Sequence, residues 1–209
     1  MFEKTFWIVG GACTGKSTLS GALSESLGFS LIDMDARIYG TWQSVYSADK
    51  FPENYHWIQQ SNALDWALRQ SDDEYFGYCN RVSLEYFQLL KLELSRLGNQ
   101  AGSIVDGGFS SLMPWVSHLD QANVVCLDVD RDVAVSEWNT DPDRVVFKQE
   151  IQALPSGEKK WIRFLELDAL ITSQLVAQAK DYRIPVINPR AAGSMQGTVD
   201  QVMSLWAVS

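Results

Sequence analysis

The residues from Gly10 to Ser17, GGACTGKS, constrain this chain of 209 residues more than any other stretch. They match the pattern G-x-x-x-x-G-K-[ST] at every fixed position. Residues 5–9 are predicted to form a short buried strand, and residues 16–27 a helix that ends at Gly28. A glycine-rich turn between a strand and a helix directs backbone N–H groups towards one centre, so we expect an anion-binding loop here.

The loop is predicted to hold the phosphates of a nucleotide, which bring several negative charges close together. Backbone donors and the positive end of the following helix would bind the β-phosphate, and Lys16 would reach the β- and γ-phosphates. The Ser17 hydroxyl is of the type that binds Mg²⁺ in such loops. We therefore expect ATP and Mg²⁺ as cofactors. The predicted nucleotide-binding residues of the loop are Gly10, Gly11, Ala12, Cys13, Thr14, Gly15, Lys16, Ser17 and Thr18.

Strand and helix patterns alternate along the rest of the chain. The predicted helices separate the strands, and this alternation is typical of a parallel sheet with helices on both faces. With 209 residues, of which 46% are hydrophobic, the chain suits a single domain that spans residues 1–209. The predicted strands are residues 5–9, 29–33, 103–106, 123–129 and 184–188.

Two segments between the strands differ in character. Residues 54–69 and 71–97 are predicted to form two helices, and Ser71 followed by Glu74 is a capping box at the start of the second one. Residues 139–157, in contrast, are polar and contain two prolines. We therefore expect them to be irregular and mobile.

The composition argues against several classes of partner. A net charge of −9 disfavours a broad basic surface for nucleic acid or anionic lipid. The sequence contains no run of about 18 apolar residues, so we expect no membrane partner. Cys13, Cys79 and Cys126 lie far apart and are odd in number, which argues against a disulfide framework or zinc site and fits a reducing cytoplasm. The sequence leaves the oligomeric state open.

Acidic residues follow three of the predicted strands, at the edge where ligands of open parallel sheets gather. Asp33 and Asp35 follow the second strand, where each would either contribute to a site or cap the next helix. Asp106 ends the third strand before two glycines and is predicted to support a metal or a substrate, the alternative being a turn-forming role. Asp128, at the end of the fourth strand, is interpreted as structural.

The stretches GGACTGKST, LGFSLIDMD, DGG and VVCLDVD together resemble the small P-loop metabolite kinases. Shikimate kinase is the most similar family, within the wider nucleoside-monophosphate-kinase-like group. The resemblance implies a P-loop NTPase fold, α/β, with three layers (α/β/α) around a five-stranded parallel sheet of order 2-3-1-4-5. It also implies a helical insert at about residues 40–100 that binds the acceptor and a lid at about residues 139–157 that closes over ATP.

The resemblance also implies roles for the acidic residues. Asp33 would hold Mg²⁺ through a water molecule, and Asp35 would bind the hydroxyl of the phosphoryl acceptor. Ser17, Asp33 and Asp106 form the predicted metal site.

The predicted catalytic set is Lys16, Asp35 and Arg144, with Arg144 as the lid arginine that contacts the transferring phosphoryl group. Arg190, in the loop after the fifth strand, would touch the adenine ring. The predicted acceptor-binding residues are Asp33, Asp35, Arg37, Gly107 and Gly108.

Together these residues predict an ATP-dependent phosphotransferase that acts on a small hydroxylated metabolite. A nucleoside or nucleotide kinase is the first alternative, since aromatic residues of the insert would stack on a base. These residues are Trp42, Tyr46, Tyr55, Trp57, Trp66, Tyr75 and Tyr78, and their simpler interpretation is helix packing. The second alternative is a nucleotide-dependent switch or binding protein with slow hydrolysis and a protein partner. Residues 40–100 contain no match to the shikimate-binding elements of the resembled family, so the acceptor itself stays open.

Overall fold

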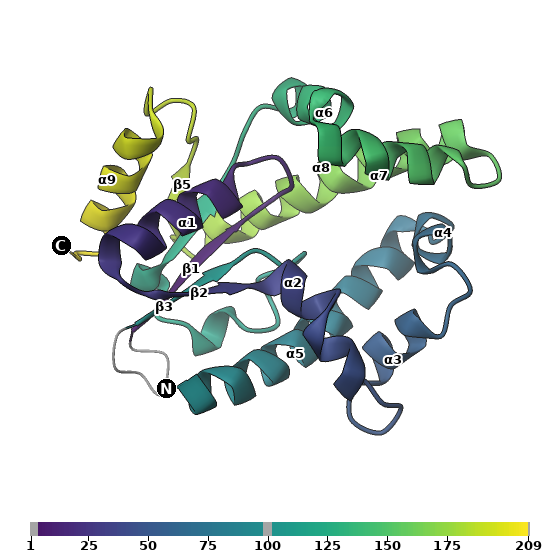
Figure 1. The fold of residues 1–209 in the computed structure, drawn as a ribbon, viewed down its shortest axis with the longest axis horizontal. Coiled ribbons are helices and arrows are strands. Elements are labelled where there is room, and N and C mark those ends of the chain that lie inside the picture. Colours follow the sequence, from purple (N-terminus) through teal and green to yellow (C-terminus); the bar gives the residue numbers. More distant parts are fainter. Residues whose placement is uncertain (1–3, 98–101, 209) are drawn as a thin grey trace.

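A parallel sheet of five strands forms the centre of the structure, a computed structural model that describes residues 4–97 and 102–208. The strand order is β2-β3-β1-β4-β5, and helices cover both faces of the sheet (Figure 1). The predicted fold class and strand order are therefore confirmed. The strands are β1 (Thr5–Gly10), β2 (Ser30–Asp33), β3 (Ser103–Asp106), β4 (Val124–Leu127) and β5 (Val186–Ile187).

The helices vary from single turns to long elements that cross the whole sheet. Short 3₁₀ turns occupy Thr41–Val45, Val116–His118 and Gln121–Asn123. The α-helices are α1 (Lys16–Leu27), α2 (Met34–Ile38), α3 (Pro52–Ile58), α4 (Ala63–Leu68), α5 (Asp72–Leu97), α6 (Arg131–Thr140), α7 (Pro142–Gln152), α8 (Gly157–Asp181) and α9 (Met195–Leu205). Within the described residues no helix is long and apolar enough to cross a membrane.

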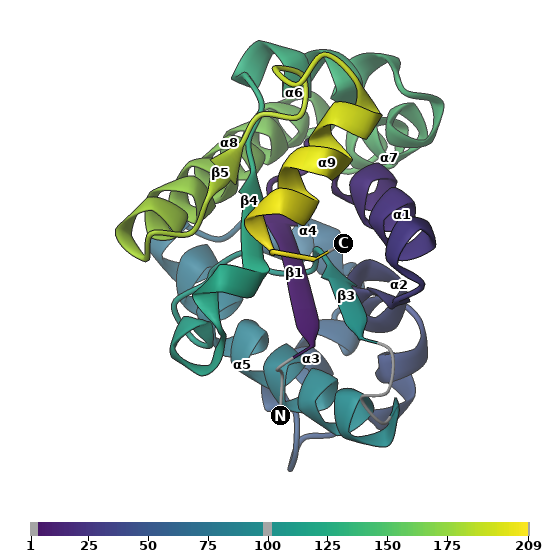
Figure 2. The same ribbon diagram turned by 90° about the vertical axis from the view of Figure 1, so that its left-hand side faces the viewer.

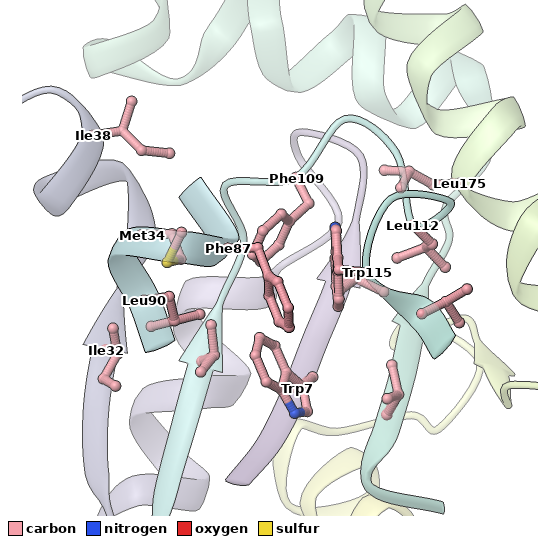
Figure 3. Close-up of a cluster of buried hydrophobic side chains, with 14 of the residues drawn as sticks. Trp7, Ile32, Met34, Ile38, Phe87, Leu90, Phe109, Leu112, Trp115 and Leu175 are labelled. Carbon is pink, nitrogen blue, oxygen red and sulfur yellow. The ribbon is translucent and has the colours of Figure 1, made fainter. Parts of the chain in front are cut away.

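Strand β1 is buried on both faces, and its side chains alternate between two hydrophobic clusters. Phe6 and Ile8 pack into the cluster formed with α1 and α9, which lie side by side in Figures 1 and 2. Trp7 and Val9 belong to the opposite cluster, which includes Phe87 from α5. Figure 3 shows the indole of Trp7 beside the ring of Phe87 in this cluster. Burial on both sides explains why β1 reads as a continuous apolar run.

The register of the sheet brings the ends of three strands to one edge. Asp106 at the end of β3 lies opposite Ile8 of β1 and opposite Asp33 of β2. The Gly107 N–H then donates to the Ile8 carbonyl at 3.1 Å, which holds the turn after β3 against β1. The loop after β1 and the acidic residues after β2 and β3 consequently share this edge.

The insert of residues 40–100 is helical, although its last residues, 98–100, lie outside the described part of the chain. The capping box at the start of α5 is confirmed, because the Ser71 N–H donates to the Glu74 carboxylate at 2.9 Å. The prediction of a single helix over residues 54–69 is wrong. The chain forms α3 and α4 instead, because the Asn62 side chain accepts the Asp65 N–H at 2.8 Å and starts a new helix.

The lid segment, residues 139–157, contains helix α7, so the prediction of an irregular segment is wrong. The Asp141 carboxylate accepts the backbone N–H groups of Asp143 at 3.1 Å and Arg144 at 3.2 Å. Pro142 occupies the first helical turn, where its missing N–H costs no hydrogen bond. Pro142, which had predicted a break in the chain, therefore lies in the first turn of α7.

Aromatic packing holds α6, α7 and α8 together. The Trp138 ring lies 4.7 Å from that of Phe164 and 5.8 Å from that of Phe147, measured between ring centroids. These rings belong to a third hydrophobic cluster, in which Ala12 and Cys13 of the phosphate loop also pack. Helix α7, in the segment that was predicted to be a lid, consequently packs in the same cluster as the loop after β1.

Replacing the capping residue tests this description of the lid. The substitution Asp141→Ala removes the acceptor of two N–H groups and is expected to cost the helix about 1 kcal/mol. Amide hydrogen exchange over residues 142–152 should then accelerate about fivefold, as a loss of this size predicts. The control is Asp143→Ala, in the same turn of α7, which should leave the exchange rates nearly unchanged. Equal acceleration in both variants would contradict the capping role of Asp141.

Candidate active site

The phosphate loop, residues 10–17, joins β1 to α1 through backbone that glycine favours. Gly10 has a φ of 141° and Gly15 a φ of 85°, and a side chain at Gly10 would overlap the Leu127 carbonyl. The Thr14 hydroxyl donates to the Gly11 carbonyl at 2.9 Å, and the Lys16 ammonium donates to the same oxygen at 2.6 Å. These bonds tie the loop into a tight arch at the start of α1, where the helix dipole favours an anion.

Lys16 is half-buried and lies among carboxylates. A methyl group built onto Gly107 would stand 3.2 Å from the Lys16 side chain, so the turn after β3 touches the lysine. Burial lowers the pKa of Lys16, while the charges of Asp106, Asp35 and Asp168 act in the opposite direction. The Lys16 ammonium therefore lies where an added anion could contact both the lysine and the backbone N–H groups of the loop.

Asp106 fits a role beside Mg²⁺. Its carboxyl is 5% exposed and forms side-chain hydrogen bonds with Ser17 and Ser20. Its Oδ1 is buried without a hydrogen-bond partner among the described residues. Burial raises the pKa of Asp106, and the bonds to Ser17 and Ser20 and the charge of Lys16 oppose that rise. A hydroxyl and an unsatisfied carboxylate oxygen side by side are the oxygen donors that Mg²⁺ prefers.

In the described part of the chain, no three His, Cys, Asp or Glu side chains form a metal-binding group. This finding is compatible with Mg²⁺, which usually keeps several waters and binds one or two carboxylates together with substrate phosphates. Asp33 lies opposite Asp106 in the sheet but caps α2, accepting the Ala36 N–H at 3.0 Å. Capping uses one oxygen of the Asp33 carboxylate and leaves the other available to accept a hydrogen bond from water.

A cavity of about 330 Å³ opens beside Lys16 and Ser17. Asp35 from α2 and Arg144 from α7 also line it. The remaining wall comes mainly from the insert, from the turn after β3 and from Trp138 of α6. Elements far apart in the sequence thus enclose one space next to the phosphate loop.

Asp35 and Arg144 have the charges that a phosphoryl-transfer site needs. Burial raises the pKa of Asp35, and the Lys16 charge opposes this shift while Asp33 and Asp106 add to it. The Arg144 guanidinium lies over the Trp138 ring at 4.4 Å from its centroid. This packing holds the arginine at the cavity wall.

Two predicted arginines lie away from this cavity. Arg37 pairs with Glu93 at 2.8 Å, and the same carboxylate accepts the Trp42 indole N–H at 3.2 Å. Arg190 pairs with Glu137 at 2.7 Å. Neither arginine lines the cavity, whereas Gly108 does and is packed so closely on Met34 that a side chain there would overlap it.

Asp168 of α8 is a site residue that the sequence did not reveal. Its carboxylate accepts the Trp138 indole N–H at 3.0 Å and bonds to the backbone N–H of Ala12 in the phosphate loop. Burial raises its pKa, and the charges of Lys16 and Arg144 lower it. No motif surrounds Asp168 in the sequence, and its partners precede it by 30 residues or more, so a local pattern could not have identified it.

A second cavity, of about 800 Å³, lies along α6 and α8. It is lined by Asp128, Arg131 and Lys180, and it reaches Ala12 and Asp168. Lys16 and Ser17 do not line it. The smaller cavity is the candidate site because Lys16 and Ser17 of the loop line it together with Asp35 and Arg144.

Comparison with known proteins gives similarity at the level of structure. No protein-family model matches the chain, and no curated protein is similar to it in sequence. A shikimate kinase from Acinetobacter baumannii in complex with shikimate matches with 15% identity and a TM-score of 0.41, covering 82% of this chain and 79% of that one. A gluconokinase from Sinorhizobium meliloti 1021 matches with 13% identity and a TM-score of 0.37, covering 85% and 98%. Likenesses of this size carry no information about substrate, so the function rests on the site geometry.

The substitution Asp106→Asn tests the burial of this carboxyl. The folded protein holds the Asp106 proton more tightly than the unfolded chain, so its free energy of unfolding falls as pH rises above the ordinary pKa of 3.8. Asparagine cannot ionise, so the variant does not lose free energy of unfolding in this way as pH rises. The ligand-free variant should melt at least about 2 °C higher than the wild type at neutral pH, and the gain should shrink towards about pH 4.

Thermal unfolding at several pH values measures this difference. The control is Asp130→Asn, because Asp130 is exposed and its replacement should leave the melting temperature unchanged at every pH. A melting temperature of Asp106→Asn below that of the wild type across the whole range would contradict the assignment.

Proposed function

We propose that this chain transfers the γ-phosphoryl group of ATP to a hydroxyl of a small molecule bound in the 330 Å³ cavity. The observation that carries the proposal is that Lys16 and Ser17 of the phosphate loop line the same cavity as Asp35 and Arg144. A phosphate donor site and an acceptor space therefore share one wall. Such proximity provides the positioning on which phosphoryl transfer mainly depends.

The phosphate loop binds the donor in this proposal. Its backbone N–H groups and the start of α1 hold the β-phosphate, and Lys16 reaches the β- and γ-phosphates. Ser17 and Asp106 would hold Mg²⁺, directly and through water, with Asp33 behind them. When bound, the ion neutralises charge on the phosphate oxygens.

Asp35 and Arg144 act on the transfer itself. The acceptor oxygen forms a bond to the γ-phosphorus while the bond from that phosphorus to the β–γ bridging oxygen breaks, and ADP leaves. Asp35 orients the acceptor hydroxyl and takes its proton, for which a raised pKa makes the carboxylate a better base. Arg144 stabilises the negative charge spread over the moving phosphoryl group.

A nucleoside kinase is the second candidate, and one observation favours it. Trp57, Tyr75 and Tyr78 line the cavity, so flat rings of the insert face the acceptor space. A base would stack against them. A nucleotide-dependent switch explains this enclosed space less well, since hydrolysis needs only a water molecule beside the γ-phosphate.

Loss of the loop lysine tests the donor site. The substitution Lys16→Ala removes the cation at the β- and γ-phosphates, and acceptor-dependent ADP release should fall at least about a hundredfold. Circular dichroism should show an unchanged fold. The exposed Lys50 provides the control, since Lys50→Ala should keep wild-type turnover. Full turnover by Lys16→Ala would refute the site.

The acceptor site is tested by two matched aspartates. Asp35→Asn removes the proposed base and should lower turnover about a hundredfold or more. Asp128→Asn alters an aspartate that lines the other cavity, and its turnover should change much less. The assay is ADP release with pooled hydroxylated metabolites and nucleosides as acceptors. A larger loss in Asp128→Asn would move the acceptor site to the end of β4.

A further inference from the structure

The lining of the 330 Å³ cavity combines a few charged side chains with many aromatic and aliphatic ones. Among its described lining residues, Lys16, Asp35 and Arg144 are the charged side chains, and all belong to the phosphate-transfer end. The other side chains that line it are mainly rings and aliphatic groups, including Trp57 and Tyr78. From this lining we infer that the acceptor is a ring-bearing hydroxyl compound without any anionic group, an inference that rests on the function proposed above.

Three arginines in or beside the insert are engaged in ion pairs and do not line the cavity. Arg81 pairs with Glu53 at 2.6 Å, and Arg69 forms an ion pair with Asp65. Arg37 is likewise held by Glu93. None of these arginines lines the cavity. Arg144 is therefore the one arginine among the described residues that line the cavity. In the proposed reaction it contacts the γ-phosphoryl group, so it would not be available to pair with a carboxylate of the acceptor.

A buried carboxylate behind the wall makes an anion still less favourable. Glu85 is 7% exposed and accepts hydrogen bonds from the N–H of Glu53 at 2.9 Å, the N–H of Asn54 at 3.0 Å and the Asn54 amide at 2.7 Å. Burial raises the pKa of Tyr78 well above its usual range, and the charges of Glu53 and Glu85 add to the shift. The tyrosine hydroxyl stays protonated, so the wall presents neutral hydrogen-bonding groups next to a negative charge. Burying a second, unpaired anion there would be costly.

The geometry of the rings fits a flat partner. Trp57 and Tyr78 lie nearly parallel, with 16° between their planes and 6.0 Å between their centroids. The Trp66 ring meets Tyr78 edge-on at 5.0 Å, which fixes the tyrosine from behind. One face of each ring is turned to the other, so the ring surface that lines the cavity is held rigidly, and contact with it favours planar, apolar molecules at low entropic cost. The volume of 330 Å³ is at the small end of ligand pockets and suits a compact ring system.

A matched pair of probes tests the inference in the presence of Mg²⁺ and a non-hydrolysable ATP analogue, so that phosphate groups occupy Lys16 and Arg144. The probes are benzyl alcohols that carry a para carboxamide or a para carboxylate, and their binding is measured by ligand-detected NMR titration. The amide should bind at least about tenfold more tightly than the carboxylate. Equal or tighter binding of the carboxylate would overturn the inference, as would the absence of amide binding up to about 10 mM.

Two variants of α3 locate the binding. Trp57→Ala removes a ring of the cavity wall and should weaken amide binding about fivefold. Tyr55→Ala is the control, because Tyr55 lies on the same helix but packs against the main core, and its amide affinity should remain that of the wild type. Equal losses in both variants would place the probe elsewhere and overturn the inference.

The result is separable from the proposed function. ATP turnover that depends on Lys16, found together with a preference for the carboxylate probe, would refute the acceptor class and keep the kinase. Selective amide binding with no acceptor-dependent ADP release would refute the kinase instead.

Discussion

The register at the carboxyl ends of β1, β2 and β3 is the constraint on which the candidate site depends. Because the strands are parallel, the loop after β1 and the acids after β2 and β3 emerge at one edge of the sheet. Asp33, Asp106 and Ile8 are aligned in that register, and Lys16 begins the helix that follows the loop. A shift of one residue would turn the Asp106 side chain to the opposite face and away from Ser17. Hydrogen bonding between neighbouring strands thus sets the chemistry of the edge.

Several carboxylates are buried together at this edge, and a bound cation would stabilise them. Asp35, Asp106 and Asp168 each have a raised pKa because each is desolvated, and Lys16 opposes the shift in all three. A triphosphate adds further negative charge to the same space. A divalent ion beside Ser17 would relieve both the carboxylates and the phosphates. The unpartnered Asp106 oxygen is a cost of folding that such an ion would offset.

Local patterns predicted the sheet and the glycine turn between β1 and α1, but not helix α7 or the side chains that enclose the cavity. The loop depends on glycines and on Lys16 at fixed spacing, so its geometry is visible in eight residues. Short runs of apolar residues likewise predict the strands β1 to β5. Helix α7 was missed because Pro142 is read as a break until Asp141 is seen to cap it. Asp168 was missed because contacts with Trp138 and the loop exist only after the helices have packed.

Helices α6 to α8 and the loop of residues 10–17 share one packed unit, which bears on how these elements move. Ala12 and Cys13 pack in the same cluster as Trp138, and Asp168 bonds to both Trp138 and the Ala12 N–H. Trp138 in turn supports Arg144. Any displacement of α6 must therefore disturb the hydrogen bond at the loop and the position of the arginine together. In this arrangement the conformation of the loop and the placement of Arg144 are coupled through the Trp138 indole rather than through the sheet.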